Sequence, residues 1–501
     1  MEDETPNILQ RWFAPDFGEP SYLRARWIWI RALGAIFFSA FYSLYFQIHG
    51  LIGPNGILPA SGYFPAVRDA FGAKAYWIAP SLLWIDASDR ALDVLVWTGF
   101  VASALIIFNV WPRVSIAVAA IAFLSFIAAA QDFSSYQSDG MLLEAALLSI
   151  FFAPRGIWPG LGRDQPPSKA SLFMLRWEWF RIYFESGVVK ILSGEPQWRN
   201  LTAMDKYYEN GPLPTWIGWH VQQWPHGFHA ATAAFTLISE LLIAWLVFFP
   251  KWSRRIAFIL TTPLQIAIIL TANYAFLNHL VLFLGFLLLD DQAFNVARAL
   301  LPVRAPAGVP VPHKPSYAAA VVLPILFITT VASFFMPAFP TVILLEPFRV
   351  ANSYGLFAVM TRARYEIEFQ GTADGKTWYA YPFRYKPQNI RKAPGIYAPY
   401  QPRFDWNLWF ASLGSWVDNR WVLNTEVRLL QNEPAVLQLF AGNPFARKPV
   451  IAVRAVEWQY WFTNPAERLA SGAWWKRELI GQYAPATKRM PDGSIQLQET
   501  Q

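Results

Sequence analysis

The 501-residue sequence contains no cysteine. Structural disulfides, thiolate metal sites and cysteine nucleophiles are therefore excluded. Histidine is also scarce, with six residues in the chain. Three of these, His220, His226 and His229, lie close together, but their spacing matches no standard zinc pattern. No glycine-rich phosphate loop, nucleophile elbow or kinase signature is present. We therefore expect no metal site and no cofactor.

Charged residues are scarce as well. They make up only 15% of the chain, whereas an average soluble domain has about a quarter. Hydrophobic types reach 54% and aromatic types 17%. The net charge of +7 is spread between apolar runs and forms no basic patch, which argues against nucleic acid as a partner. This composition indicates that much of the chain faces lipid rather than water.

Apolar runs long enough to cross a bilayer as helices recur along the first two thirds of the chain. The N-terminus, Met1 to Pro6, lacks the features of a cleavable signal peptide, so we expect the first run to be an uncleaved signal-anchor. The fourth run is short and contains Glu144, and the fifth is heavily charged. The predicted spans, about nine in number, are 27–48, 91–110, 114–130, 137–153, 170–192, 230–249, 254–272, 274–290 and 317–337.

Basic residues in the short connections predict the orientation. If the N-terminus is cytoplasmic, the inner connections carry most of the lysines and arginines, including Arg155, Lys251 and Arg254. After nine spans, the chain beyond Met336 lies on the non-cytoplasmic side. The sequence thus predicts an α-helical, multi-pass integral membrane protein, with a transmembrane domain over 1–345 that contacts the lipid bilayer.

The composition changes near residue 350, where apolar and polar residues begin to alternate with period two. We predict a C-terminal mixed α+β soluble domain over 350–485 and a loose tail over 486–501. Its expected elements are a hairpin of strands 364–369 and 378–385, helices within 405–442, and a strand over 450–462.

Tryptophans crowd this C-terminal domain. Large aromatic side chains are typical of a core, but an exposed aromatic surface can also grip a client protein or the membrane. The sequence leaves both interpretations open. The residues are Trp406, Trp409, Trp416, Trp421, Trp458, Trp461, Trp474 and Trp475.

The fifth predicted span carries an unusual set of charges. Glu178, Arg181 and Glu185 fall on one narrow helix face, where spacings of three and four allow pairing. Arg176 and Lys190 project to the other side and need partners in neighbouring spans. The candidate partners are Glu144 and Glu240.

Ionisable groups in a span face a bundle interior or a wet cavity, because lipid does not solvate them. One interpretation is a polar cavity that binds a ligand or transfers protons, with Lys190 and Glu185 as candidate catalytic residues. The other is an ion-pair network that fixes helix packing.

Six separated segments carry a family resemblance: 50–59, 185–194, 198–203, 382–387, 402–406 and 443–445. Together they resemble the lipase maturation factor family, and the resemblance extends from about residue 25 to 483. It implies a membrane protein that helps dimeric lipases fold and assemble, with its C-terminal domain in the lumen of the endoplasmic reticulum in animals. The missing cysteines and short loops indicate a bacterial-type member of the inner membrane, whose client is an exported protein such as a lipase. The motif residues Trp198, Arg199, Asn200, Asp405 and Trp406 are candidate client contacts.

A second, shorter resemblance gives a different hypothesis. The segment 187–192 and the following Trp198 are similar to the transmembrane domain of vitamin K-dependent carboxylases. There, a lysine at the position of Lys190 is a catalytic base, and burial can adapt a lysine to this role. The two hypotheses are thus a non-enzymatic membrane assembly factor and a membrane enzyme that acts on a lipid-soluble substrate through a Lys/Glu cavity.

Overall fold

A computed structural model describes residues 7–498, apart from residues 19, 135, 295–313 and 447. The segment 1–6, considered above for a signal peptide, and the last three residues of the predicted tail lie outside the described residues. Each of the nine predicted spans is helical. The corresponding helices are α2 (Leu23–Ile52), α5 (Asp89–Ile107), α6 (Pro112–Ala129), α7 (Gln137–Phe152), α8 (Lys169–Leu192), α12 (His226–Leu241) with η4 (Ile243–Phe248), α13 (Lys251–Thr271), α14 (Leu277–Gly285) with η5 (Phe286–Leu288), and α15 (Tyr317–Phe335).

Six of these helices are long and apolar enough to cross a membrane, within the described residues: α2, α5, α6, α12 with η4, α13 and α15. Helix α7 has 16 residues, which gives it a length of about 24 Å, less than the hydrocarbon core of about 30 Å. Helix α8 has 24 residues but carries many charges. A chain with membrane-spanning helices is therefore confirmed, and the number nine stays a prediction.

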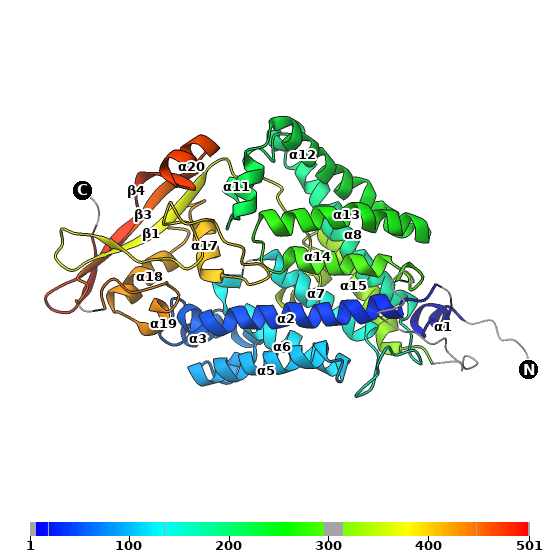
Figure 1. The fold of residues 1–501 in the computed structure, drawn as a ribbon. Helices are drawn as coiled ribbons and strands as arrows, with labels where there is room; N and C mark the ends of the chain where they lie inside the picture. The colour runs from blue at the N-terminus through cyan, green and yellow to red at the C-terminus, as the bar shows by residue number, and fades with distance from the viewer. Residues whose placement is uncertain (1–6, 19, 135, 295–313, 447, 499–501) are drawn as a thin grey trace, which may run out of the picture.

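The connections between these helices gather at two ends of the bundle. At one end, Arg26 in the first turns of α2 donates to carbonyl oxygens of the α7–α8 connection, including those of Leu161 and Gln165. Arg254, at the start of α13, bonds the Tyr22 hydroxyl there. At the other end, the α8–α12 connection meets the C-terminal domain. Figure 1 shows α1 and the C-terminal domain at opposite ends of the molecule.

Short helices complete the membrane part and its connections. They are α1 (Ile8–Phe13), α3 (Ala60–Phe71), η1 (Gly72–Lys74), α4 (Ala75–Ile78), η2 (Leu82–Trp84), η3 (Gln131–Ser134), α9 (Pro196–Arg199), α10 (Tyr207–Asn210), α11 (Trp216–Gln222), α16 (Pro340–Leu345) and η7 (Glu346–Phe348).

The C-terminal domain is built on a five-stranded antiparallel sheet with strand order β2-β1-β3-β4-β5. Helices α17 and α18 pack against it, as the predicted mixed α+β class requires. Ile367 and Phe369 alternate with charged residues along β1, which is why the period-two pattern was visible in the sequence. The elements are β1 (Arg364–Thr372), β2 (Tyr379–Ala380), α17 (Arg403–Ala411), α18 (Trp421–Leu430), α19 (Pro434–Leu437), β3 (Ala452–Phe462), α20 (Pro465–Ser471), β4 (Trp475–Arg489) and β5 (Ile495–Gln498).

The eight tryptophans named above are buried or half-buried. Four of them, Trp406, Trp409, Trp421 and Trp475, are below 10% exposure. The other four are half-buried. These side chains therefore belong mainly to the core, and the interpretation as one exposed aromatic surface does not fit the structure.

The segment from 486 onward differs from the loose tail that we predicted. Strand β4 continues to Arg489, and β5 pairs with Ala486 to Arg489. The turn between them contains Asp492 and Gly493, and the Met490 amide donates to the Ser494 carbonyl. Asp-Gly is a strong turn signal, and strand pairing satisfies the backbone of a segment that is mostly polar. Polarity alone was therefore the wrong guide.

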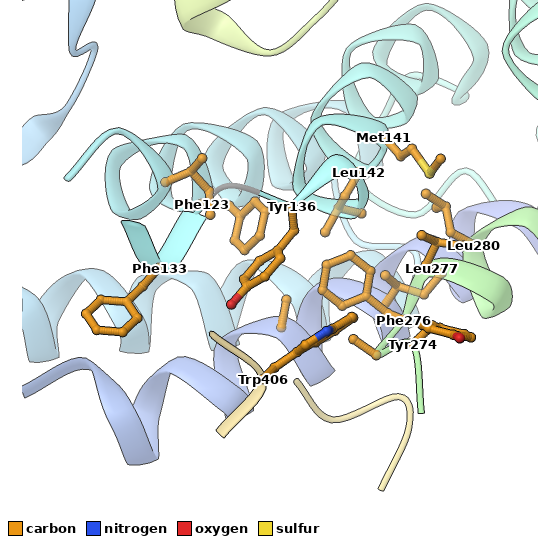
Figure 2. Packing of buried hydrophobic residues seen from close by; sticks show 14 of the residues in the cluster. Phe123, Phe133, Tyr136, Met141, Leu142, Tyr274, Phe276, Leu277, Leu280 and Trp406 are labelled. Carbon is orange, nitrogen blue, oxygen red and sulfur yellow. The ribbon is translucent and has the colours of Figure 1, made fainter. Parts of the chain in front are cut away.

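Helix α17 joins the two parts of the molecule. The Trp406 ring stacks on Tyr136 at a centroid distance of 5.1 Å and lies 6.4 Å from Tyr274. Figure 2 shows Trp406 among side chains of the helical bundle, including Phe276 and Leu142. A membrane-domain surface and a C-terminal-domain surface thus share one apolar core.

Candidate functional site

The charges of α8 lie in the interior of the bundle. The helix begins after Ser168, whose side chain caps it, and packs against α7, α12, α14 and α15. Glu178, Arg181, Glu185 and Lys190 are each 3% exposed or less. Buried charges are costly unless they are paired and hydrogen-bonded, so their partners show what the helix holds.

Arg181 is the centre of the first group. Its guanidinium pairs with Glu144 of α7, donates to the Asn352 carbonyl oxygen at 2.5 Å, and lies 3.9 Å from Glu185. The other oxygen of Glu144 accepts from the Asn352 amide at 3.1 Å and from the Tyr354 hydroxyl at 2.9 Å. Glu144 is therefore the ion-pair partner of Arg181. Arg176, for which Glu144 was also a candidate partner, instead donates to the Leu287 carbonyl in η5 at 2.9 Å.

The residues 352–358, here called the linker segment, lie along α8. The Glu185 carboxylate accepts the Tyr354 amide at 2.7 Å, and the Ser186 hydroxyl accepts the Leu356 amide at 3.3 Å. Further on, the Trp198 indole donates to the Phe357 carbonyl at 2.9 Å. The charged face of α8 is thus a receptor for the chain that leads into the C-terminal domain. The contact between α8 and the linker segment was not predicted from the sequence, because residues 352–358 contain no motif that indicates a binding segment.

Lys190 forms the second group. Its ammonium donates to Glu240 of α12 at 2.8 Å, to the Leu356 carbonyl at 2.8 Å and to the Ser186 carbonyl at 3.4 Å. It also lies 5.1 Å from the Trp198 ring centroid. A lysine ammonium has three N–H donors, and all three are in use. The structure therefore brings Lys190 and Glu240 together, in a group separate from that of Arg181.

A cavity of about 340 Å³ lies beside this second group, and Lys190, Glu240 and Ser186 line it. Glu178, Arg181 and Glu185 are not among its lining residues. The first interpretation, one polar cavity for all these charges, therefore does not fit, because the charges form two groups. The Arg181 group is closed by the linker segment, while the Lys190 group faces space.

Glu178 is the exception among the four buried charges of α8 named above. Its carboxylate is fully buried, and neither oxygen has a hydrogen-bond partner among the described residues. It lies near the paired Glu144 and Arg181. Its position in the interior makes it part of the packed cluster rather than of the cavity.

A third buried ion pair joins the domains. Arg403 of α17 donates to both carboxylate oxygens of Asp139 on α7, each at 2.8 Å, and to the Phe133 carbonyl at 2.9 Å. Both side chains are 1% exposed. A two-pronged contact of this kind fixes orientation as well as position. Neither residue is among the candidate site residues predicted from the sequence, although Asp139 lies near the start of the fourth predicted span.

The five motif residues fall into two groups. Trp198, Asp405 and Trp406 are 5% exposed or less, so in this structure they are unable to touch a client. Arg199 and Asn200 are exposed. Only these two remain available as candidate client contacts.

Asp405, in the C-terminal domain, has a perturbed acidity. Burial raises the pKa of Asp405 from 3.8 to about 6, although the backbone amides of Lys386 and Tyr385 donate to it and the Lys386 charge lies nearby. The neighbouring carboxylate of Glu366 raises this pKa further. The ionised Asp405 carboxylate therefore destabilises the folded state, although two backbone amides donate hydrogen bonds to it.

We expect Asp405→Asn to stabilise the protein at neutral pH. In the parent, the folded state binds the Asp405 proton more tightly than the unfolded chain does. This proton binding stabilises the folded parent fully below about pH 4, and the stabilisation is lost as the pH rises toward 6. An asparagine keeps an acceptor oxygen for both amides and does not ionise. The variant should exceed the parent by on the order of 3 kcal/mol at pH 7 and match it near pH 4 in thermal unfolding. A variant less stable than the parent at pH 7 would contradict this.

Comparison with known proteins places both parts of the chain. A profile of the lipase maturation factor transmembrane domain matches residues 24–296, and one of the lipase maturation factor C-terminal domain matches residues 350–485. No solved structure matches the chain.

Curated relatives are similar over almost the whole length. Lipase maturation factor 1 of Bos taurus is 30% identical, over 94% of this chain and 91% of its own. Lipase maturation factor 2 of Gallus gallus is 29% identical, over 93% of this chain and 82% of its own. Human lipase maturation factor 1 is 28% identical, over 93% and 89%. The similarity thus includes α8, the linker segment and α17.

Proposed function

Because the chain belongs to the lipase maturation factor family, we propose that it assists the folding and assembly of exported client proteins, of which a lipase is the first candidate. The observation that carries this proposal is the match of both family domains, in order, within one chain. We place the protein in a bacterial inner membrane, since the chain lacks cysteine and has short loops. The C-terminal domain then faces the non-cytoplasmic side, where exported clients fold.

The interface between the membrane part and the C-terminal domain fixes the orientation of the surface that a client would contact. The linker segment is bound along α8, and Arg403 ties α17 to α7. A domain held by buried polar contacts on two sides keeps one orientation relative to the membrane. The exposed Arg199 and Asn200 would therefore keep a constant position relative to the five-stranded sheet when a client binds.

The enzyme alternative has less support. The comparisons do not support a carboxylase-type function. In addition, all three donors of Lys190 are occupied, whereas a catalytic base needs contact with its substrate.

The proposal is tested by producing the protein together with a secreted lipase, in cells that lack their own maturation factor. We expect a several-fold rise in secreted lipase activity per amount of lipase. Arg199→Ala with Asn200→Ala should reduce the rise, and Arg420→Ala, at another exposed position, should not. If correctly inserted protein leaves lipase activity at the background level, the proposed function is wrong.

Deleting the whole C-terminal domain is a poor substitute for these variants. Removal of residues 350–485 would take away the linker contacts of Arg181, Glu185 and Lys190. The remaining membrane part would then carry unpartnered buried charges and is expected to misfold for that reason alone.

The orientation can be measured directly, because the parent chain has no cysteine. We introduce Ser471→Cys in the C-terminal domain or Arg155→Cys in the α7–α8 connection, both at exposed positions. A membrane-impermeant maleimide should label the first variant in cells with an intact inner membrane and the second only after permeabilisation. The cysteine-free parent is the control for background. The reverse labelling pattern would place the domain in the cytoplasm.

A further inference from the structure

The cavity beside Lys190 has the properties of a ligand site. It is enclosed by α8, the α8–α12 connection, α12, α13, α14 and part of the linker segment. Its volume of about 340 Å³ lies within the range of small-molecule pockets, which are mostly apolar with a few placed polar groups. Apolar residues such as Ile182, Leu264 and Phe357 form most of its wall. An apolar chain would fit this lining.

Two of the helices that enclose the cavity border lipid. In the 18-residue apolar stretch of α12 with η4, only 28% is buried. The corresponding share is 22% in α13 and 61% in α2. Leu270 of α13 lines the cavity and is 43% exposed, and the half-buried Thr232 and Thr236 of α12 line it from the facing helix. A ligand would therefore enter from the membrane, which favours an amphiphile over a water-soluble molecule.

The polar groups at the cavity define the head of this amphiphile. Lys190 and Glu240 neutralise each other, so a charged headgroup would find no compensating charge. All three donors of Lys190 are in use. Glu240, by contrast, has one buried carboxylate oxygen without a hydrogen-bond partner among the described residues. The free group is thus an acceptor, and it requires a ligand that donates a hydrogen bond.

We propose that this cavity binds a neutral membrane lipid that bears a free hydroxyl, of the acylglycerol type, with the hydroxyl donating to Glu240 and the acyl chain lying between α12 and α13. The site does not depend on the proposed function, because neither of the two remaining candidate client contacts, Arg199 and Asn200, lines the cavity. Occupancy satisfies the unpartnered oxygen of Glu240 and fills the apolar space.

The test uses the full chain in membranes and two photoreactive probes with the same diazirine-bearing acyl chain. One probe is a monoacylglycerol, which has hydroxyl groups, and the other is the fatty acid methyl ester, which has no donor. We expect the monoacylglycerol to label peptides of α12 or α13 at least about fivefold more strongly, the value of one net hydrogen bond. Equal labelling by both probes would overturn the role of Glu240, and labelling only outside the cavity-lining peptides would overturn the site.

A matched pair of substitutions tests the location. Thr236 and Thr262 are both half-buried threonines in membrane helices, but only Thr236 lines the cavity. Thr236→Phe should fill the cavity and reduce labelling at least about fivefold, while Thr262→Phe should leave labelling unchanged. Unfolding temperatures show whether both variants are folded. Unchanged labelling of a folded Thr236→Phe variant would refute the proposal.

Discussion

Replacement of Arg403 by methionine is expected to destabilise the protein by about 3–5 kcal/mol. The substitution leaves Asp139 buried at 1% exposure without its two-pronged partner, and it removes the donor for the Phe133 carbonyl. An unpaired buried carboxylate is far more costly than the loss of the pair as a whole. Because this pair connects α17 to α7, the lost stability should appear as loosening of the C-terminal domain from the bundle.

The measurement is thermal unfolding in detergent, together with limited proteolysis of the domain junction. Arg403→Met with Asp139→Leu removes both charges and should recover most of the lost stability. Lys476→Met breaks the exposed pair with Glu467 and should change stability by less than about 1 kcal/mol. If the Arg403 variant unfolds like the Lys476 variant, the buried pair does not hold the domains together.

The interface between the domains marks the limit of what sequence could predict. Within the described residues, hydrophobic runs located a helix at each of the nine predicted spans, and the number of membrane crossings stays a prediction. Period-two alternation located the strands β1 and β3. Burial imposes both patterns locally. The mutual position of Arg403 and Asp139 has no local pattern. They lie 264 residues apart, and their contact exists only once the two domains are packed.

The α8 charges show the same limit more sharply. Helical spacing correctly placed Glu178, Arg181 and Glu185 on one face, and neighbouring spans supplied Glu144 and Glu240 as partners. Periodicity shows that a charged face needs a partner, but it does not show whether the partner is a ligand or another part of the chain. Here much of the partner is the linker segment, whose backbone amides and carbonyls carry no sequence signature.

Lys190→Met is expected to be as costly as the Arg403 substitution, at about 3–5 kcal/mol. The substitution leaves the Glu240 carboxylate unpaired inside the bundle and removes the donor to the Leu356 carbonyl. The amount of folded protein, measured by size-exclusion chromatography and thermal unfolding, should therefore fall. This differs from what a purely catalytic lysine would show, since loss of a base abolishes activity and leaves the fold intact.

The double variant Lys190→Met with Glu240→Leu separates structure from chemistry at this site. With both charges removed, no unpaired carboxylate is left at this site and the main remaining loss is the donor to the Leu356 carbonyl. Stability should therefore return to within about 1–3 kcal/mol of the parent. If Lys190 is structural, client maturation returns together with the folded protein, whereas the preference for the hydroxyl-bearing lipid probe is lost because its acceptor is gone. A double variant that is folded but inactive in client maturation would instead show that Lys190 acts chemically, and the membrane-enzyme hypothesis would then replace the assembly factor.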